Sequence, residues 1–253
     1  MHDKIESLLS PTAKFTRHEN TFCFFLDSDR PLWSMALERS YSEFGGSLDM
    51  RHNFQRKREE ASGCSILWKF FDFVTEPGGV VIDLASGPSG YFASALDRLK
   101  SDAILIAADA CPTVLSALAD ASANERFFLF DLDLDQPLPL RDASVDVFSG
   151  NLLCNVNRYP DLLREVFRCL KPGGRLAVME SFFEEGSATA EFLTQRQAIF
   201  SSLKTYVDFC ESVGFEYLGG DLLRETTGKL DPGDLLPIAP EDRSLTRTVF
   251  FQK

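Results

Sequence analysis

The feature that most restricts the fold of this chain is a regular alternation of short apolar strands with amphipathic helices from residue 80 onward. Strands are expected at 80–85, 103–109, 126–132, 144–150, 175–181, 215–223 and 245–253, and helices at 91–100, 112–122, 159–170 and 203–214. Repeated strand–helix units predict a parallel, doubly wound α/β sheet with helices on both faces. The last two strands have no helix between them, so we expect them to pair antiparallel at the edge.

The first 75 residues follow a different pattern, with two helix candidates and no strand–helix repeat. These are "DRPLWSMALERSYSEF" at 29–44 and "CSILWKFFDFV" at 64–74, after which "EPGG" at 76–79 breaks the chain. We therefore predict an N-terminal helical cap at 1–75 and a larger domain at 76–253. A chain of 253 residues is long enough for both.

The formal net charge of −12 is unevenly distributed along the chain. Residues 1–70 are neutral, so the whole excess of acid lies in residues 71–253. An acidic main domain repels phosphate backbones, which makes nucleic acid an unlikely partner. The basic cluster "RHNFQRKREE" at 51–60 ends with Glu59 and Glu60 and is interpreted as a solvated helix face.

Composition also bears on compartment and metal content. No apolar run approaches the ~20 residues needed to cross a bilayer, and the first residues lack the apolar stretch of a secretion signal. We therefore expect a cytoplasmic protein with no membrane contact. Six scattered cysteines without a CxxC pair are expected to be reduced and mostly buried, and with only three histidines no metal site is predicted.

The stretch "VVIDLASGPSGYFASALDRLK" at 80–100 reads as a strand, a glycine-bearing loop and a helix. In an open α/β sheet such a loop lies at the ligand-binding edge. The G-x-G-x-x-G pattern of dinucleotide sites is absent, and Asp83 precedes the loop. A carboxylate there would repel a pyrophosphate and would suit a cationic or amine-bearing ligand.

Two more carboxylates follow at the ends of the next two strands. Asp109 ends the second strand and can accept hydrogen bonds from both hydroxyls of a ribose. Asp131 ends the third and can accept from an adenine amino group. Each residue alone is more often a helix cap or a solvated loop acid. Three in phase at consecutive strand ends instead indicate a nucleoside site.

These motifs resemble those of the class I S-adenosylmethionine-dependent methyltransferases of the small-molecule type. "VVIDLASGPSG" resembles the first motif of that family, with Asp83 as its acid, Gly87 retained, and Ala85 and Ser89 in place of two glycines. The stretches "LIAADAC", "LFDLDLDQPLPLRDASVDVFSGNLL" and "LLREVFRCLKPGGRLAVME" resemble the later motifs in order. The resemblance covers residues 78–253 and implies a Rossmann-like, seven-stranded sheet that is mostly parallel with an antiparallel edge strand.

The resemblance also implies S-adenosyl-L-methionine as the cofactor. Nine residues are expected to bind it: Asp83, Ala85, Ser86, Gly87, Asp109, Ala110, Asp131, Leu132 and Asn151. Because the added methyl of an alanine is tolerated only at negative φ, we expect a negative φ at Ala85.

Residues on the substrate side are fewer and rest on the same resemblance. Tyr41 in the cap, Cys154 and Asn155 after the fourth strand, and Phe182 after the fifth are expected to contact the substrate, and Glu180 lies beside them. His52 is the candidate base, because the loop after the fourth strand lacks the histidine that many relatives have there. Ordinary packing or surface roles are the alternative for all of these residues.

The predicted function is therefore methyl transfer to a nitrogen, oxygen or sulfur atom of a small molecule, with the cap as a lid over the substrate. The chain has 23 phenylalanines, and an aromatic acceptor would fit apolar walls made by some of them. Two alternatives remain: an RNA or protein methyltransferase, and a cofactor-binding protein of this fold that transfers no methyl group. The acceptor atom and the oligomeric state are not indicated by the sequence.

Overall fold

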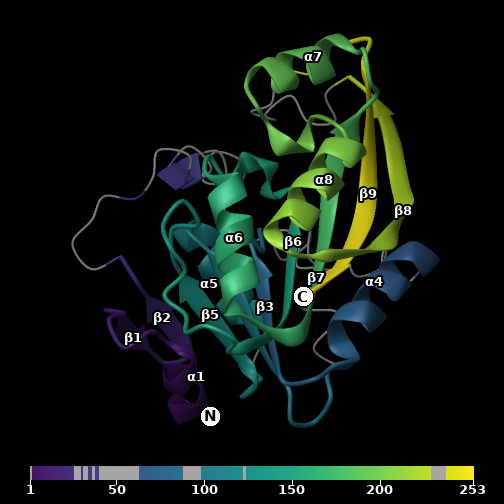
Figure 1. Ribbon diagram of the computed structural model, residues 1–253. Helices are drawn as coiled ribbons and strands as arrows, with labels where there is room; N and C mark the ends of the chain where they lie inside the picture. The colour runs from purple at the N-terminus through teal and green to yellow at the C-terminus, as the bar shows by residue number, and fades with distance from the viewer. Residues whose placement is uncertain are drawn as a thin grey trace.

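The computed structural model describes residues 2–25, 30, 34–35, 38–39, 63–87, 98–121, 124–228 and 238–253. In this part of the chain one nine-stranded sheet has the order β1-β2-β5-β4-β3-β6-β7-β9-β8 (Figure 1). Helices cover both faces, so the molecule has three layers. Within the described residues, no helix combines the length and the apolar character of a membrane span.

The centre of the sheet consists of the parallel strands that the sequence predicts. They are β3 (Val80–Leu84), β4 (Ile104–Asp109), β5 (Phe127–Asp131), β6 (Val145–Asn151) and β7 (Leu170–Phe183). Every residue of β3, β4 and β5 is buried, as expected for short apolar strands covered on both faces. The prediction of an α/β, mostly parallel sheet is confirmed.

The two final strands form the antiparallel end of the sheet. β9 (Arg243–Gln252) runs antiparallel both to β7 and to β8 (Glu216–Thr227), as predicted from the missing helix between them. The register between β8 and β9 shifts twice, between Tyr217 and Gly219 and between Leu222 and Arg224. β8 is the outermost strand at this end of the sheet.

The helices divide between the two faces according to their apolar sides. On one face α1 (His2–Leu8), α6 (Tyr159–Cys169) and α8 (Leu203–Val213) pack in the larger core. On the other face α4 (Ser65–Thr75) and α5 (Pro112–Ala121) pack in a second core. Three shorter elements complete the order: η3 (Leu153–Asn155) follows β6, and α7 (Ala188–Gln195) and η4 (Ile199–Ser201) lie between β7 and α8.

The N-terminal residues extend the sheet, which the sequence did not predict. β1 (Thr16–His18) and β2 (Thr21–Cys23) form a hairpin, and β2 pairs parallel with β5. The described sheet therefore has two strands more than the predicted seven. Both the hairpin and α4 pack with the main sheet, although residues 1–75 were assigned to a cap. A cap is still predicted for residues 26–62, most of which lie outside the described part.

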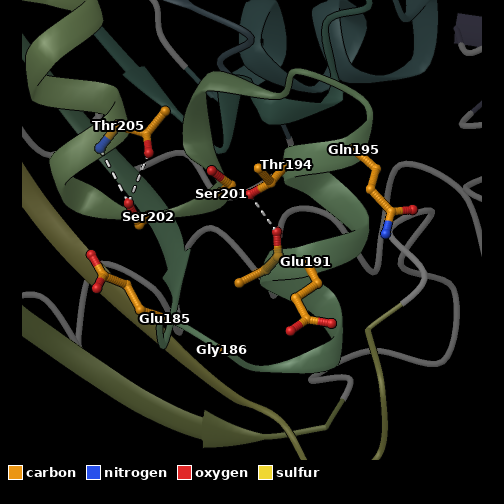
Figure 2. Close-up of a pocket in the computed structure, with 9 residues that line it drawn as sticks. Glu185, Gly186, Glu191, Thr194, Gln195, Ser201, Ser202 and Thr205 are labelled. Atoms are coloured by element: carbon orange, nitrogen blue, oxygen red, sulfur yellow. Dashed lines mark hydrogen bonds between the residues drawn. The ribbon is translucent and has the colours of Figure 1, made fainter.

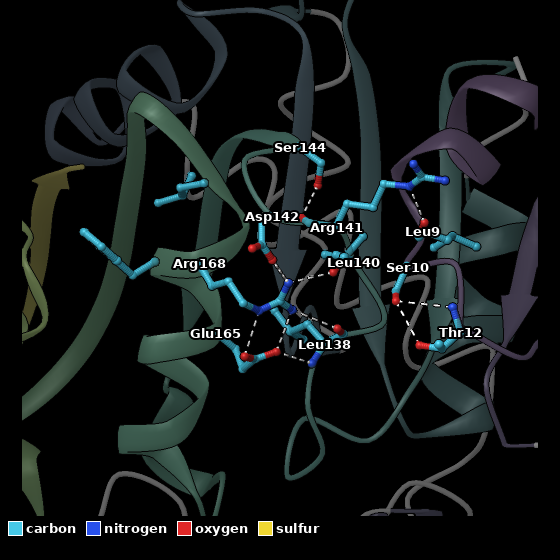
Figure 3. Close-up of polar contacts among 12 residues, drawn as sticks. Leu9, Ser10, Thr12, Leu138, Leu140, Arg141, Asp142, Ser144, Glu165 and Arg168 are labelled. Carbon is cyan, nitrogen blue, oxygen red and sulfur yellow. Dashed lines mark hydrogen bonds and ion pairs between the residues drawn. The ribbon is translucent and has the colours of Figure 1, made fainter.

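Arg168, in the last turn of α6, fixes the loop that leads into β6 (Figure 3). Its guanidinium donates to the Glu165 carboxylate at 2.7 Å, to the Asp142 carboxylate at 2.6 Å and to the Leu140 carbonyl at 2.9 Å. Without such a donor, burying the Leu140 carbonyl would be unfavourable. Arg141 in the same loop donates to the Leu9 carbonyl at 2.8 Å and so ties the N-terminal segment to the main domain.

Candidate functional site

Three buried carboxylates lie at the carboxyl ends of three adjacent strands. Asp83 is the fourth residue of β3, and Asp109 and Asp131 are the last residues of β4 and β5. Asp109 and Asp131 are direct partners in the β4–β5 register. Because the strand order is β5-β4-β3, the three side chains lie at one edge of the sheet on neighbouring strands, as the motifs predict.

Asp83 is held by two serine hydroxyls. Its Oδ1 accepts a hydrogen bond from the Ser149 hydroxyl at 2.8 Å, and the Ser86 hydroxyl donates to its backbone carbonyl at 3.0 Å. Burial raises the pKa of Asp83 to about 7, although the two serines act in the opposite direction. A cation placed beside this group would favour its ionised form.

Asp109 holds the glycine loop against the end of β4. Its Oδ2 accepts the Gly87 N–H at 2.9 Å, and its Oδ1 accepts the Cys111 N–H at 2.9 Å. Burial raises the pKa of this carboxyl group, while these backbone donors lower it. Each oxygen uses one of its two lone pairs, so each has one left for a ligand hydroxyl.

The glycine loop adopts a left-handed backbone at two of its described residues. The φ of Gly87 is +55°, and the φ of Ala85 is +49°. The expectation of a negative φ at Ala85 is therefore wrong: the fold keeps the geometry that a glycine would adopt and imposes it on an alanine, at a cost of about 1 kcal/mol. Backbone strain of this kind is found most often at binding loops. Ser89, the other replaced glycine, lies outside the described residues.

Asp131 is paired with Arg30, which none of the sequence motifs includes. Arg30 forms two hydrogen bonds with its carboxylate, at 2.8 Å to Oδ1 and 2.6 Å to Oδ2, and the Cys23 thiol donates to Oδ2 at 3.3 Å. Arg30 also donates to the Ala110 carbonyl at 2.7 Å and lies over the ring of Phe25. This side chain thereby spans the ends of β4 and β5.

Two further side chains from the N-terminal region reach the same edge. The Ser34 hydroxyl donates to the Ala110 carbonyl. The Glu38 carboxylate accepts from the Thr113 N–H at 3.0 Å and from the Cys111 thiol at 2.9 Å, at the start of α5. These hydrogen bonds lower the pKa of Glu38 although its partial burial opposes them. No local pattern in the sequence signals these contacts, because their partners are more than 70 residues away.

The expected substrate side contains a second buried acid. Glu180, at the end of β7, is fully buried, and its carboxylate accepts the Cys154 N–H at 3.0 Å and the Ser181 N–H at 2.9 Å. Burial raises the pKa of Glu180 to about 7. Just before η3, Leu152 has a φ of +52°, so the turn that Glu180 holds is itself strained.

The predicted substrate residues differ in their placement. Cys154 is buried beside Glu180, whereas Asn155 is exposed and Asn151 is half-buried at the end of β6. Phe182 lies in the core against Tyr206, with ring centroids 5.5 Å apart, and not on an open wall. Leu132 is buried next to Asp131. Tyr41 and His52 lie outside the described residues.

A pocket of about 450 Å³ lies around α7 and the start of α8 (Figure 2). Its lining includes the exposed carboxylates Glu185 and Glu191 and the hydroxyls of Ser202 and Thr205. The Ser202 hydroxyl caps α8 by accepting from the Thr205 N–H at 3.1 Å. In the part of the chain that the structure describes, no three His, Cys, Asp or Glu side chains are grouped so as to hold a metal ion.

Comparison with known proteins bears on this arrangement. Residues 82–178 match the family model of a methyltransferase domain. Over 132 residues the chain is 34% identical to the ubiquinone/menaquinone biosynthesis C-methyltransferase UbiE of Azotobacter vinelandii, a match that covers 47% of this chain and 50% of that protein. The chain spans half or less of the length of the curated relatives that it matches.

Solved structures extend the likeness over more of the chain. Phosphoethanolamine N-methyltransferase 2 of Haemonchus contortus, bound to phosphomonomethylethanolamine and S-adenosylhomocysteine, aligns with a TM-score of 0.60 at 14% identity, covering 88% of this chain and 60% of that one. The 4+2 cyclase SpnF aligns with a TM-score of 0.52 at 17% identity, covering 73% and 80%. At such identities the likeness shows the fold alone.

Proposed function

We propose that the chain is a class I S-adenosylmethionine-dependent methyltransferase that transfers a methyl group from this cofactor to a small molecule, as its methyltransferase domain and its fold support. The observation that carries the proposal is the row of buried carboxylates on β3, β4 and β5. The residues that match the methyltransferase domain, 82–178, include all three carboxylates.

The residues present fit the cofactor. Both Asp109 oxygens retain a lone pair for the ribose hydroxyls while they hold the Gly87 and Cys111 amides. Among the described residues, a β-carbon at Gly87 would have only the Ala85 carbonyl within 4 Å, which leaves room for a ligand beside this backbone. Burial raises the pKa of Asp83, and the cationic methionine end of the ligand would favour the ionised form of this carboxylate.

When bound, S-adenosylmethionine supplies the sulfonium methyl group, and the chain supplies position and electrostatics. Asp109 would fix the ribose, and Asp131 would accept from the adenine amino group. Glu180 and the η3 turn would border the acceptor, and the residues around them would keep water away. We further propose that residues 26–62 form the cap and that Tyr41 and His52 act from it.

A small-molecule acceptor is supported by three observations. Residues 71–253 carry the entire net charge of −12, which disfavours nucleic acid. UbiE relatives are named for quinone biosynthesis, and the Haemonchus contortus enzyme was solved with a small phosphorylated amine. Neither name identifies the acceptor of this chain, so nitrogen, oxygen, sulfur and carbon acceptors all belong in an activity screen.

Calorimetric titration with S-adenosylhomocysteine tests the cofactor half of the proposal. We expect binding to the wild type and a loss of about 100-fold in Asp109→Ala, because two hydrogen bonds to a charged group are lost. Asp102→Ala, which removes an exposed carboxylate before β4, is the matched control and should bind normally. A folded wild type that does not bind, or an Asp109→Ala variant that binds equally well, would overturn the proposal.

A second candidate is a protein of this fold that binds the cofactor without transferring its methyl group. The likeness to the cyclase SpnF supports this second candidate, because one fold can support several reactions. The loop from Asn151 to Asn157 also lacks histidine. Incubation with methyl-labelled cofactor separates the two: transfer requires labelled acceptor and product nucleoside in equal amounts.

A further inference from the structure

The outer edge of β8 has the features of an interface. β8 is the last strand of the sheet, 12 residues long, and only β9 pairs with it among the strands that the structure describes (Figure 1). The other side of such a strand presents backbone N–H and C=O groups without a strand partner. Monomeric proteins usually protect an edge of this length.

Two of the large apolar side chains exposed in the described part of the chain lie on this strand. Leu218 is 44% exposed and Leu222 is 41% exposed. Single exposed leucines are ordinary, but two on one unpaired edge form an apolar strip that gains from being covered. The two leucines are placed symmetrically, each two positions from Gly220.

The charges of β8 extend the same symmetry. Glu216 and Arg224 are exposed and lie four positions on either side of Gly220. Their charged neighbours on the strand are already paired: Asp221 with Lys69 and Glu225 with Arg243. Among the residues that the structure describes, Glu216 and Arg224 take part in no ion pair, so neither charge is neutralised by that part of the chain.

We propose that β8 pairs antiparallel with β8 of a second copy of this chain, around a twofold axis at Gly220. In that register Leu218 lies opposite Leu222 of the second copy, and Glu216 lies opposite Arg224. The twofold axis repeats each of these contacts, giving two leucine pairs and two ion pairs. Directly opposed apolar and oppositely charged side chains are the contacts that stabilise paired strands.

The pattern "EYLGGDLLR" favours a second copy over an unrelated strand. An unrelated strand would need only a complementary edge, whereas here the strand is complementary to itself about one central residue. The two register shifts of β8 against β9, between Tyr217 and Gly219 and between Leu222 and Arg224, lie on either side of that centre. This inference does not depend on the proposed methyl transfer.

Sedimentation equilibrium of the full chain tests the proposal. At about 0.15 M salt we expect a species of twice the 28.3 kDa chain mass, with a dissociation constant in the micromolar range typical of small interfaces. Glu216→Arg alone and Arg224→Glu alone each place like charges opposite one another and should weaken association at least about 10-fold. The double exchange Glu216→Arg with Arg224→Glu should restore it.

Controls separate this from general effects of charge or folding. Glu185→Arg alters an exposed charge elsewhere and should leave association unchanged. Thermal melting checks that each variant is folded, and Leu222→Lys, which removes an exposed side chain, gives a second route to the monomer. A wild type that stays monomeric up to about 100 µM, single exchanges without effect, or a double exchange that fails to restore pairing would each overturn the proposal.

Discussion

Arg30 and Asp131 form a bidentate ion pair at the end of β5, with nitrogen–oxygen distances of 2.8 and 2.6 Å. The two residues lie 101 positions apart in the chain. Asp131 is also the carboxylate expected to accept from an adenine amino group. With the Cys23 thiol on Oδ2 as well, three of its four acceptor positions are in use, so the ion pair and the ligand share one group.

One acceptor position of Asp131 therefore remains for the adenine amino group, while Arg30 holds the carboxylate in place. Arg30→Ala should bind S-adenosylhomocysteine about 10-fold more weakly, because the carboxylate loses the bidentate partner that orients it. Calorimetric titration measures this. Arg17→Ala, which breaks an exposed ion pair with Glu6, is the control and should not alter affinity. Unchanged or tighter binding in Arg30→Ala would contradict this positioning role.

Ala85→Gly should stabilise the protein. The alanine is held at φ +49°, where a β-carbon costs about 1 kcal/mol and a glycine costs less. The unfolded chain gains entropy from the glycine, so the net gain is smaller, and we expect a rise in melting temperature of about 2 °C. Ala143→Gly is a matched control at φ +48° in a distant loop. Only the change at residue 85 should also alter cofactor affinity; equal effects from both would show that the loop strain is unrelated to binding.

Cofactor affinity should rise with pH as Asp83 ionises. The pKa of Asp83 is raised to about 7 by burial, and a ligand with a cationic amine favours its ionised form. S-Adenosylhomocysteine should thus bind at least about 10-fold more tightly at pH 7.5 than at pH 5.5, with little change above pH 7.5. Titrations across this range measure the slope. Asp83→Asn should bind weakly with a flat profile, and an equal slope in both proteins would show that another group titrates.

Glu180 should make the folded state less stable as pH rises. Its folded pKa of about 7 lies above the ordinary 4.5, so the folded chain holds a proton that the unfolded chain has lost between these values. Its contribution is fully present below pH 4.5 and disappears by about pH 7. In Glu180→Gln that loss is absent, so the stability of wild type minus variant should fall by up to about 3 kcal/mol over this range.

Urea unfolding at pH 4.5, 6 and 7.5 measures the difference between the two proteins. Glu185→Gln, an exposed glutamate on the following turn, should parallel the wild type at each pH. A difference between wild type and Glu180→Gln that stays constant with pH would mean that Glu180 is ionised throughout, despite its burial.

The strands were predictable because local sequence determines them. β3, β4 and β5 are runs of buried, mostly apolar residues, each with its carboxylate at or near the end, and these patterns need no knowledge of the fold. The hairpin of β1 and β2 was missed because three residues are too short for a period. Its pairing with β5 joins segments more than 100 positions apart, which no local pattern indicates.

The site was predictable only in part, for a related reason. Motif positions such as Asp109 can be read from their strand, but the Arg30–Asp131 pair depends on a contact between distant segments. The φ of Ala85 was expected to be negative because local sterics favour it, and the surrounding fold overrides that preference. Phe182 was expected in a pocket, yet alternation along β7 does not reveal which face meets Tyr206.

The hairpin of β1 and β2 also has a consequence for how the chain folds during synthesis. β2 pairs with a strand whose last residue follows Cys23 by 108 positions. A ribosome needs about 5 to 20 seconds to add that many residues. Throughout that interval β2 can pair only with β1, because β5 has not yet been made. The N-terminal hairpin therefore joins the sheet late, after most of the nucleoside-binding edge has been synthesised.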